Sequence, residues 1–246
     1  GTTGKPKGAM HVQAGLISAV RSACANLPQF DSDERVCFLP LCHIAERLIG
    51  AYSALLSGAT LNFVESPDTF AENLREISPH VLFAVPRVWE KFYSGVTIAV
   101  AEASPLQQRA YHWAIATGRA VADTVLAKQP VPPALKLRFW LARWLVLDNV
   151  RRMIGIQRAR VLVSGAAPIS PDLIRWYLAL GLPMLEGWGM TETCGASTGI
   201  PADRIKPGSI GPAAQYNQVH IDPETGEIQV KGDNVFMGYL NQPEKT

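Results

Sequence analysis

The sequence predicts an α/β fold made mainly of parallel β-sheet layers with helices on both faces. Five short apolar or β-branched runs alternate with longer segments of helical periodicity, which indicates strands joined by crossover helices. The predicted strands are 36–41, 59–65, 80–86, 159–165 and 183–189. The predicted helices are 9–25, 44–57, 68–77, 87–103, 105–127, 134–153 and 170–180.

The pattern changes after residue 203. Turn pairs such as Asp222-Pro223 and short alternating runs such as EIQVKG (227–232) predict a small antiparallel β unit. We therefore expect an α/β core over 1–202 and a β subdomain over 203–246. The stretch QPVPP (129–133) joins two predicted helices and indicates an insertion within the core.

Composition excludes several classes of protein. The 246 residues are 48% hydrophobic, enough for a sizeable core, and the net charge of +2 provides no general field for nucleic acid. The four cysteines form no C-x-x-C pair, so we expect reduced, packed thiols in a cytoplasmic protein, with a disulfide or metal role as the alternative. The chain starts at Gly1 without an initiator methionine and stops at Thr246 in a polar turn, so we expect an excerpt of a longer protein.

The first eight residues, GTTGKPKG, have the composition of a loop that wraps a polyphosphate. Glycines let backbone N–H groups approach an anion closely, threonines add hydroxyl donors and lysines add cations. The residues that would do this are the glycines Gly1, Gly4 and Gly8, the hydroxyls of Thr2 and Thr3, and the cations of Lys5 and Lys7. The spacing does not fit the Walker pattern, and an ordinary surface turn is the competing interpretation.

Three further segments follow predicted strands at the edge where ligands of parallel sheets gather. They are PLCHIAE (40–46), SGAAP (164–168) and EGWGMTET (186–193). Trp188 offers a π face for a base, Thr191 a hydroxyl, and Glu192 a hard carboxylate suited to Mg²⁺. A core tryptophan and a solvated helix-start acid are the structural alternatives.

These motifs, followed by GEIQVKGDNVFMGYLNQPEKT (226–246), resemble in order and spacing those of the acyl-adenylate-forming ligases, over the whole chain. The segments FLPLCHIAERL (38–48) and VPRVWEKF (85–92) resemble the long-chain fatty acid–CoA ligase branch. The resemblance implies a fragment of the large N-terminal domain of such an enzyme. It also implies that a ribose-binding aspartate, a hinge and a C-terminal lid domain with a lysine lie downstream, so the excerpt alone should catalyse little.

The resemblance implies a two-step reaction with Mg²⁺, ATP and coenzyme A. A fatty acid carboxylate attacks the α-phosphorus of ATP to give acyl-AMP and pyrophosphate, and the coenzyme A thiol then displaces AMP. Transfer to a carrier protein and a non-catalytic nucleotide- or acyl-binding homologue are the alternatives. By resemblance, Lys5 and the rest of the first loop hold the β- and γ-phosphates, Thr191 bonds the α-phosphate and Glu192 ligates Mg²⁺.

The same resemblance assigns an adenine slot, made of Gly165, Ala166, Ala167, Glu186, Gly187, Trp188 and Gly189. Many relatives have tyrosine where this chain has Trp188, a change that keeps the stacking face and loses the hydroxyl. His43 is placed by resemblance between the acyl carboxylate and the thiol route, with a helix-cap histidine as the alternative. Trp89 matches an aromatic position that borders the acyl tunnel, with a simple core tryptophan as the alternative.

Two patterns point elsewhere. GASTG (195–199) satisfies the G-x-S-x-G pattern of hydrolases, but Ser197 is followed by a proline-interrupted loop, where a nucleophile elbow needs a helix. The segment 134–155 interleaves aromatic residues with four arginines, so it cannot span a bilayer cheaply but could lie on one. The alternative is an amphipathic helix packed on the sheet with its arginines in water.

Overall fold

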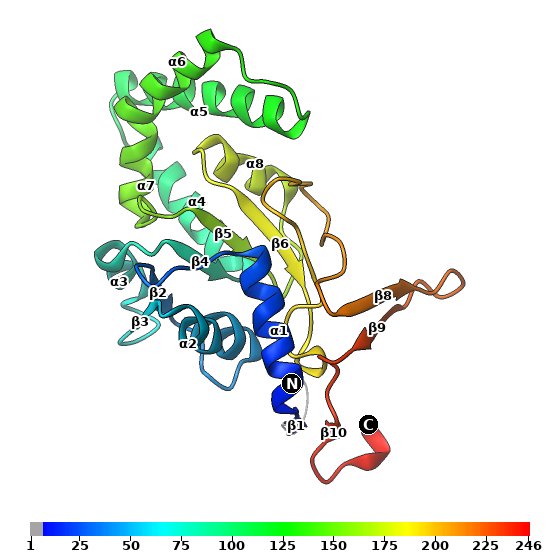
Figure 1. Ribbon diagram of the computed structural model, residues 1–246. Helices are drawn as coiled ribbons and strands as arrows, with labels where there is room; N and C mark the ends of the chain where they lie inside the picture. The colour runs from blue at the N-terminus through cyan, green and yellow to red at the C-terminus, as the bar shows by residue number, and fades with distance from the viewer. Residues whose placement is uncertain (1–6) are drawn as a thin grey trace.

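The computed structural model describes residues 7–246, and a four-stranded sheet lies at its centre (Figure 1). Its strands, in spatial order, are β4 (Val81–Ala84), β5 (Val161–Ser164), β6 (Met184–Trp188) and β7 (Thr198–Gly199). The first three are parallel, with Val81 opposite Val161 and Leu162 opposite Met184, whereas β7 is antiparallel to β6. A separate parallel pair consists of β2 (Glu34–Cys37) and β3 (Thr60–Phe63). The mainly parallel sheet architecture is confirmed.

Helices connect these strands near the positions that the periodicity predicts. The α-helices are α1 (Gln13–Asn26), α2 (Ser53–Ser57), α3 (Phe70–Ile77), α4 (Pro86–Ala101), α5 (Pro105–Leu126), α6 (Pro133–Ala142), α7 (Asp148–Ile154) and α8 (Pro171–Ala179). The π-helical turns are η1 (Glu46–Tyr52) and η2 (Arg143–Leu147), and the 3₁₀ turns are η3 (Thr191–Thr193) and η4 (Pro243–Lys245). Local sequence signals determine where several helices begin. The Ser104 side chain accepts a hydrogen bond from the Gln107 N–H at the start of α5. Proline occupies the first turn of α4, α5 and α8.

Both faces of the central sheet are buried, which explains why its strands are continuous apolar runs. Leu82, Leu162 and Met184 pack on one face into the main core, which includes the buried aromatic rings of α4 and α8. On the other face, Val163 packs against Leu185, and nearby Phe83 also packs against the cluster built by α1 and η1. Helices therefore cover both faces, as predicted.

The segment after the core forms an antiparallel hairpin of β8 (Asn217–Ile221) and β9 (Ile228–Gly232) that extends away from the central sheet (Figure 1). The chain then returns to pair β10 (Gly238–Tyr239) antiparallel with β1 (Ala9–Met10). Helix α1 accordingly begins at Gln13, and the prediction of helix from residue 9 is wrong. A partner more than 200 positions away decides this boundary, so local periodicity could not reveal it. The division into 1–202 and 203–246 stays a prediction.

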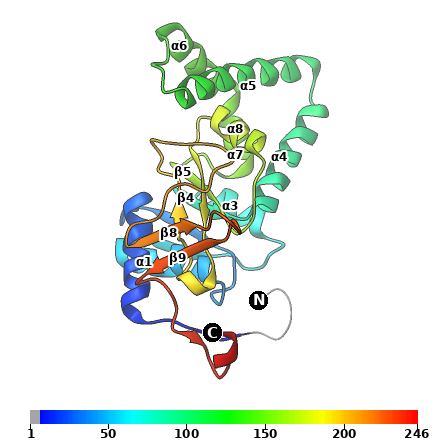
Figure 2. The same ribbon diagram turned by 90° about the vertical axis from the view of Figure 1, so that its right-hand side faces the viewer.

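The segment 134–155 forms α6, η2 and α7, and α6 packs against α5 at the end of the molecule opposite Thr246, the last residue of the chain (Figure 2). Its arginine and tryptophan side chains are not buried and exposed in the way that an amphipathic helix packed on the sheet would require. Arg151 is buried and donates from Nε to the Leu180 carbonyl at 2.8 Å, so the prediction that all four arginines lie in water is wrong. Trp140 and Trp144 are instead 60% and 67% exposed, with stacked rings 6.4 Å apart. Among residues 7–246 no helix combines the length and apolarity needed to cross a bilayer.

Candidate active site

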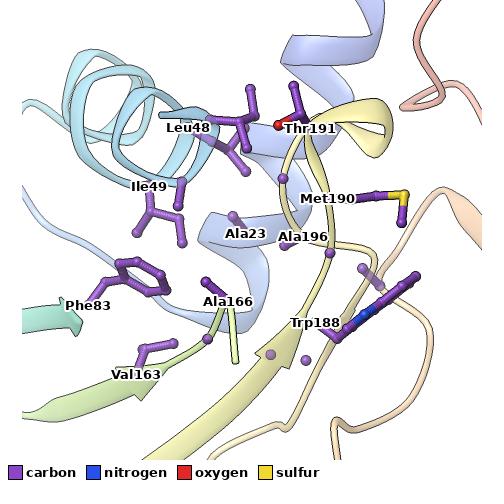
Figure 3. A pocket seen from close by; sticks show the side chains of 18 of the residues that line it. Ala23, Leu48, Ile49, Phe83, Val163, Ala166, Trp188, Met190, Thr191 and Ala196 are labelled. Atoms are coloured by element: carbon purple, nitrogen blue, oxygen red, sulfur yellow. The ribbon is translucent and has the colours of Figure 1, made fainter. Parts of the chain in front are cut away.

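A cavity of about 760 Å³ lies at the carboxyl ends of β5 and β6, beside α1 and η1 (Figure 3). The sequence-predicted site residues that line it are His43, Gly165, Ala166, Glu186, Gly187, Trp188, Gly189, Thr191 and Glu192. Residues more than 100 positions apart in the sequence are thus brought to one place. Thr2, Thr3, Gly4 and Lys5 lie outside the described residues.

The turn after β5 brings backbone close to the cavity. A Cβ on Gly165 would lie 3.1 Å from both the Gly187 carbonyl oxygen and the Phe83 ring, so the site has little room for a larger residue. Ala166 has φ of 69°, a left-handed conformation that is costly for a residue with a side chain. Ala167 is exposed and does not line the cavity, so its place in the adenine slot stays a prediction.

Strand β6 ends at Trp188, which is half-buried. Trp188 and Met190 extend to the opposite side of this segment from Leu48 and Phe83 (Figure 3). Gly189 then passes so close to a neighbouring turn that an added Cβ would lie 1.4 Å from the Gly195 carbonyl oxygen. Only glycine fits at this point, and the contact fixes the path toward Thr191.

Thr191 and Glu192 lie on the 3₁₀ turn η3, and both line the cavity. Thr193 stabilises this turn through two hydrogen bonds to its side chain. Its hydroxyl oxygen accepts one from the Met190 N–H at 3.2 Å and one from the Ser197 hydroxyl at 2.7 Å. Ser197 is fully buried and precedes a two-residue strand, not a helix, which agrees with rejecting the hydrolase pattern.

Glu186 contributes differently from the other members of the predicted adenine slot. Its Oε2 accepts the Gly208 N–H at 2.8 Å, which ties β6 to the loop that precedes the hairpin. Burial raises the pKa of this carboxyl, and the bonds from the Gly208 and Ser209 N–H groups oppose the shift. The carboxylate therefore anchors a loop, while contact with adenine stays a prediction.

Lys7, a cation of the first loop motif, lines the cavity, as does Tyr239, which the sequence argument did not single out. The Tyr239 phenol donates a hydrogen bond to Oε1 of Glu192, which raises the pKa of the phenol. Lys7 Nζ lies 4.3 Å from the centroid of the same ring, in a cation–π contact. Tyr239 belongs to the GYLN part of the last motif, which was used only to identify the family. Its contact with Glu192 had no sequence signal.

His43 is exposed at the N-terminus of the helix that continues into η1, and it lines the cavity. Its Nδ1 accepts the Ala45 N–H at 3.2 Å, and its carbonyl accepts the Arg47 N–H at 3.0 Å. The helix-cap role is therefore present in the structure. A role between carboxylate and thiol stays a prediction.

Trp89 is not brought together with the other site residues. It is fully buried in the main core, donates from Nε1 to the Ala84 carbonyl at 3.0 Å, and packs edge-on against Tyr177 at 5.2 Å. This is the arrangement of a core tryptophan, which was the alternative interpretation. Its predicted contact with an acyl chain has no support from this position.

Part of the cavity lining is apolar. Ala23, Leu48, Ile49, Phe83 and Val163 lie together there (Figure 3). They come from α1, η1, β4 and β5, so no single sequence motif marks them. The lining of one cavity therefore combines hydroxyl, carboxylate and π groups with hydrocarbon side chains.

The donor set is compatible with Mg²⁺ carried by a polyphosphate. Within residues 7–246, no three histidine, cysteine or acidic side chains converge to hold a metal by themselves. Mg²⁺ in nucleotide sites commonly takes one or two carboxylates and completes its shell with phosphate and water oxygens. Glu192 supplies one such carboxylate at the cavity wall.

Residues 1–240 match the family described as AMP-binding enzyme. The chain belongs to this family. As an AMP-binding enzyme it is 34% identical over 248 residues to a Mycobacterium tuberculosis protein assigned as a fatty-acid–CoA ligase, fadD11, covering 100% of this chain and 43% of that protein. It is 34% identical over 259 residues to the long-chain-fatty-acid–CoA ligase ACSBG2 of Gallus gallus, covering 100% of this chain and 33% of that protein. The chain thus spans less than half the length of these relatives.

Solved structures agree with this family. ATP-bound MatB from Rhodopseudomonas palustris aligns with a TM-score of 0.64 at 25% identity, covering 100% of this chain and 41% of that one. The N-terminal domain of FACL13 from Mycobacterium tuberculosis aligns with a TM-score of 0.65 at 20% identity, covering 98% and 51%, and shows the fold alone. The AMP-binding enzyme described here therefore has the fold of an adenylate-forming N-terminal domain.

Proposed function

We propose that the protein carrying this chain is a cytoplasmic ATP-dependent acid–thiol ligase that converts a long-chain fatty acid to acyl-AMP and then to acyl-CoA. The observation that carries this proposal is a cavity lined by both polar and apolar groups. Thr191, Glu192 and Trp188 offer groups suited to a nucleotide, and the side chains of Leu48, Ile49 and Phe83 are hydrocarbon. The names of the most similar relatives support the fatty acid as substrate.

The first step joins a carboxylate anion to a polyanion, so catalysis must rest on positioning and on neutralising charge. Trp188 would stack on adenine, a contact worth about 1–3 kcal/mol where it has been tested with nucleic-acid bases. The Thr191 hydroxyl would donate to the α-phosphate. Gly165 allows the turn after β5 to pass close to Gly187 and Phe83, at the end of the sheet where the flat ring would lie.

Glu192 would hold the Mg²⁺ that accompanies ATP, and the bound ion would neutralise phosphate charge as pyrophosphate leaves. On the family pattern, the first loop would hold the β- and γ-phosphates through Thr2, Thr3, Gly4 and Lys5. The acyl chain would follow the apolar wall past Leu48, and His43 would lie near the carboxylate. Coenzyme A is the proposed acceptor, with a carrier protein as the alternative that assay can decide.

Pyrophosphate release by the full-length protein tests this function. We expect release that depends on fatty acids, is highest with long chains, and yields acyl-CoA when coenzyme A is added. Glu192→Gln should lower the rate at least about 100-fold, a loss typical of removing one stabilising charge from the transition state. The matched control is Glu224→Gln in the exposed β8–β9 turn. Nucleotide binding without turnover, or transfer only to a carrier protein, would contradict the proposal.

The same protein is also proposed to contact an anionic membrane surface peripherally through α6 and η2. Leu137, Trp140 and Trp144 recur at helical spacing and are exposed, forming an apolar stripe. Residues 134–147 include three basic side chains and no acidic one. Exposed tryptophans beside basic residues suit the lipid interface, where amphipathic rings and cations are both stabilised.

Co-sedimentation with vesicles tests this contact. We expect the full-length protein to bind phosphatidylglycerol-containing vesicles better than pure phosphatidylcholine, and the double change Trp140→Ser and Trp144→Ser to abolish the difference. Leu55→Ser is the matched control because Leu55 is 82% exposed on another helix. Equal binding by the double variant and the control would contradict the proposal.

A further inference from the structure

The turn that carries Glu192 is held in place by a segment far downstream. The Phe236 N–H donates to the Glu192 carbonyl at 2.8 Å, and Asn234 Nδ2 donates to the Thr193 carbonyl at 3.0 Å. Asn234 is buried, so this bond is shielded from water. A 3₁₀ turn of three residues has few internal bonds. Its orientation therefore depends on the segment 234–240, which we call the strap.

The strap also fixes the chain that leaves the phosphate-loop motif. The Met237 N–H donates to the Met10 carbonyl and the Leu240 N–H donates to the Gly8 carbonyl, both at 2.8 Å. These bonds flank the β1–β10 pairing, in which Ala9 lies opposite Tyr239. One short segment thus bonds to both sides of the polar end of the cavity.

Tyr239 lies near the end of the strap, and neighbouring side chains restrain its ring. The Phe236 ring meets it edge-on with centroids 4.9 Å apart, and Lys7 Nζ lies 4.3 Å from its centroid. From this position the phenol donates to Oε1 of Glu192. An ionised carboxylate only accepts hydrogen bonds, so donation to one oxygen limits side-chain rotation and leaves the second oxygen available to a cation.

We propose that Tyr239 is a positioning residue that holds the Glu192 carboxylate in the orientation needed to bind the nucleotide's divalent cation. This inference rests on the proposed function, in which Glu192 takes that cation. Tyr239 acts through Glu192, to which its phenol is hydrogen-bonded. Groups that orient a metal ligand in this way usually contribute about 10- to 100-fold to metal affinity.

The test is Tyr239→Phe in the full-length protein, which keeps the ring contacts with Lys7 and Phe236 and removes only the phenol oxygen. Mn²⁺ binding in the presence of ATP, followed by electron paramagnetic resonance, provides a readout that does not need turnover. We expect the Mn²⁺ Kd to rise about tenfold. The Mg²⁺ concentration for half-maximal pyrophosphate release should rise in parallel, with the KM for fatty acid unchanged. Tyr216→Phe, at an exposed tyrosine outside the cavity, is the matched control.

A double-mutant cycle separates the possible failures. In a Glu192→Gln background, Tyr239→Phe should produce no further change in Mn²⁺ affinity, because the group it positions is gone. Unchanged affinity in Tyr239→Phe alone, tighter binding, or additive losses would overturn the inference. If Glu192→Gln itself leaves Mn²⁺ affinity unchanged, the proposed function fails instead. Urea unfolding of each variant reveals misfolding, in which case Asn234→Ala, which loosens the same turn from its other side, provides the second test.

Discussion

Arg160 holds the carboxylate of Asp33, 127 positions earlier in the chain, through a bond from Nη2 to Oδ2 of 2.7 Å. Asp33 is 2% exposed, while the Arg160 side chain remains 39% exposed. The Phe30 N–H also donates to Asp33 Oδ2 at 2.9 Å. The pair links the start of β2 to the start of β5, which aligns the two parallel sheets below the cavity.

This pair should make stability depend on pH at the acid end. The hydrogen bond from Arg160 lowers the pKa of Asp33, so the folded state binds this proton less readily than the unfolded state. The stabilisation is present above the ordinary aspartate pKa of about 3.9 and is lost as the pH falls through the lowered value. Asp33→Asn should cost about 2 kcal/mol at neutral pH in urea unfolding, and less at acid pH.

The control for that change is Asp203→Asn, whose side chain is 80% exposed and lies 3.9 Å from Arg204. It should alter the free energy of unfolding by less than about 0.5 kcal/mol. A cost for Asp33→Asn that stays constant as the pH falls would contradict the assigned cause.

Gly189→Ala should disrupt nucleotide binding without touching a nucleotide-contacting side chain. Its Cβ would meet the Gly195 carbonyl at 1.4 Å, so the segment that carries Thr191 must move. We expect a loss of about 1–3 kcal/mol in unfolding free energy and weaker ATP binding by calorimetry. Gly199→Ala is the matched control because nothing lies within 4 Å of its added Cβ. Equal behaviour of the two variants would refute this explanation.

Replacement of Trp188 should separate a stacking role from a packing role. Trp188→Ala should weaken ATP binding about tenfold, whereas Trp188→Phe, which keeps a π face, should retain most of the affinity. Trp144→Ala removes an exposed tryptophan far from the cavity and should leave binding unchanged. If the phenylalanine and alanine variants bind ATP equally weakly, stacking is not the contribution of Trp188.

The four thiols should differ widely in reactivity. Burial raises the pKa of Cys37 to about 12 and that of Cys194 to about 11, and it also raises the pKa of the half-buried Cys24. Cys42 is exposed at the cavity wall. With a disulfide reagent at pH 8, one thiol should react fast, and Cys42→Ser should remove that phase. Saturating ATP together with fatty acid should slow it, since Cys42 lies beside His43.

The sequence revealed those parts of the fold that depend on local pattern. Strands buried on both faces are apolar runs, so β4, β5 and β6 were predicted within two residues at each end. The motifs marked most of the polar cavity wall, because they follow these strands. Contacts between segments far apart in the chain have no local sequence pattern that predicts them. The pairing of β1 with β10 and the apolar wall around Leu48 both arise from tertiary packing.

Arg151 shows a different reason for a wrong prediction. An arginine in an amphipathic helix normally faces water, yet this one meets the unpaired carbonyl of Leu180 at the end of α8. The residues next to Arg151 in the sequence do not indicate that the carbonyl at this helix end lacks a hydrogen-bond donor.

The pairing of β1 with β10 also sets an order of events during synthesis. Ala9 leaves the ribosome before its partner Tyr239, which is made 230 residues later. At about 5–20 residues per second, that interval is roughly 10–50 s. The strap is made last in that interval, so the turn bearing Glu192 lacks its outer support until the segment from Asn234 onward has been made. The strands β4, β5 and β6 are complete at Trp188, so the central sheet can form before the nucleotide site is complete.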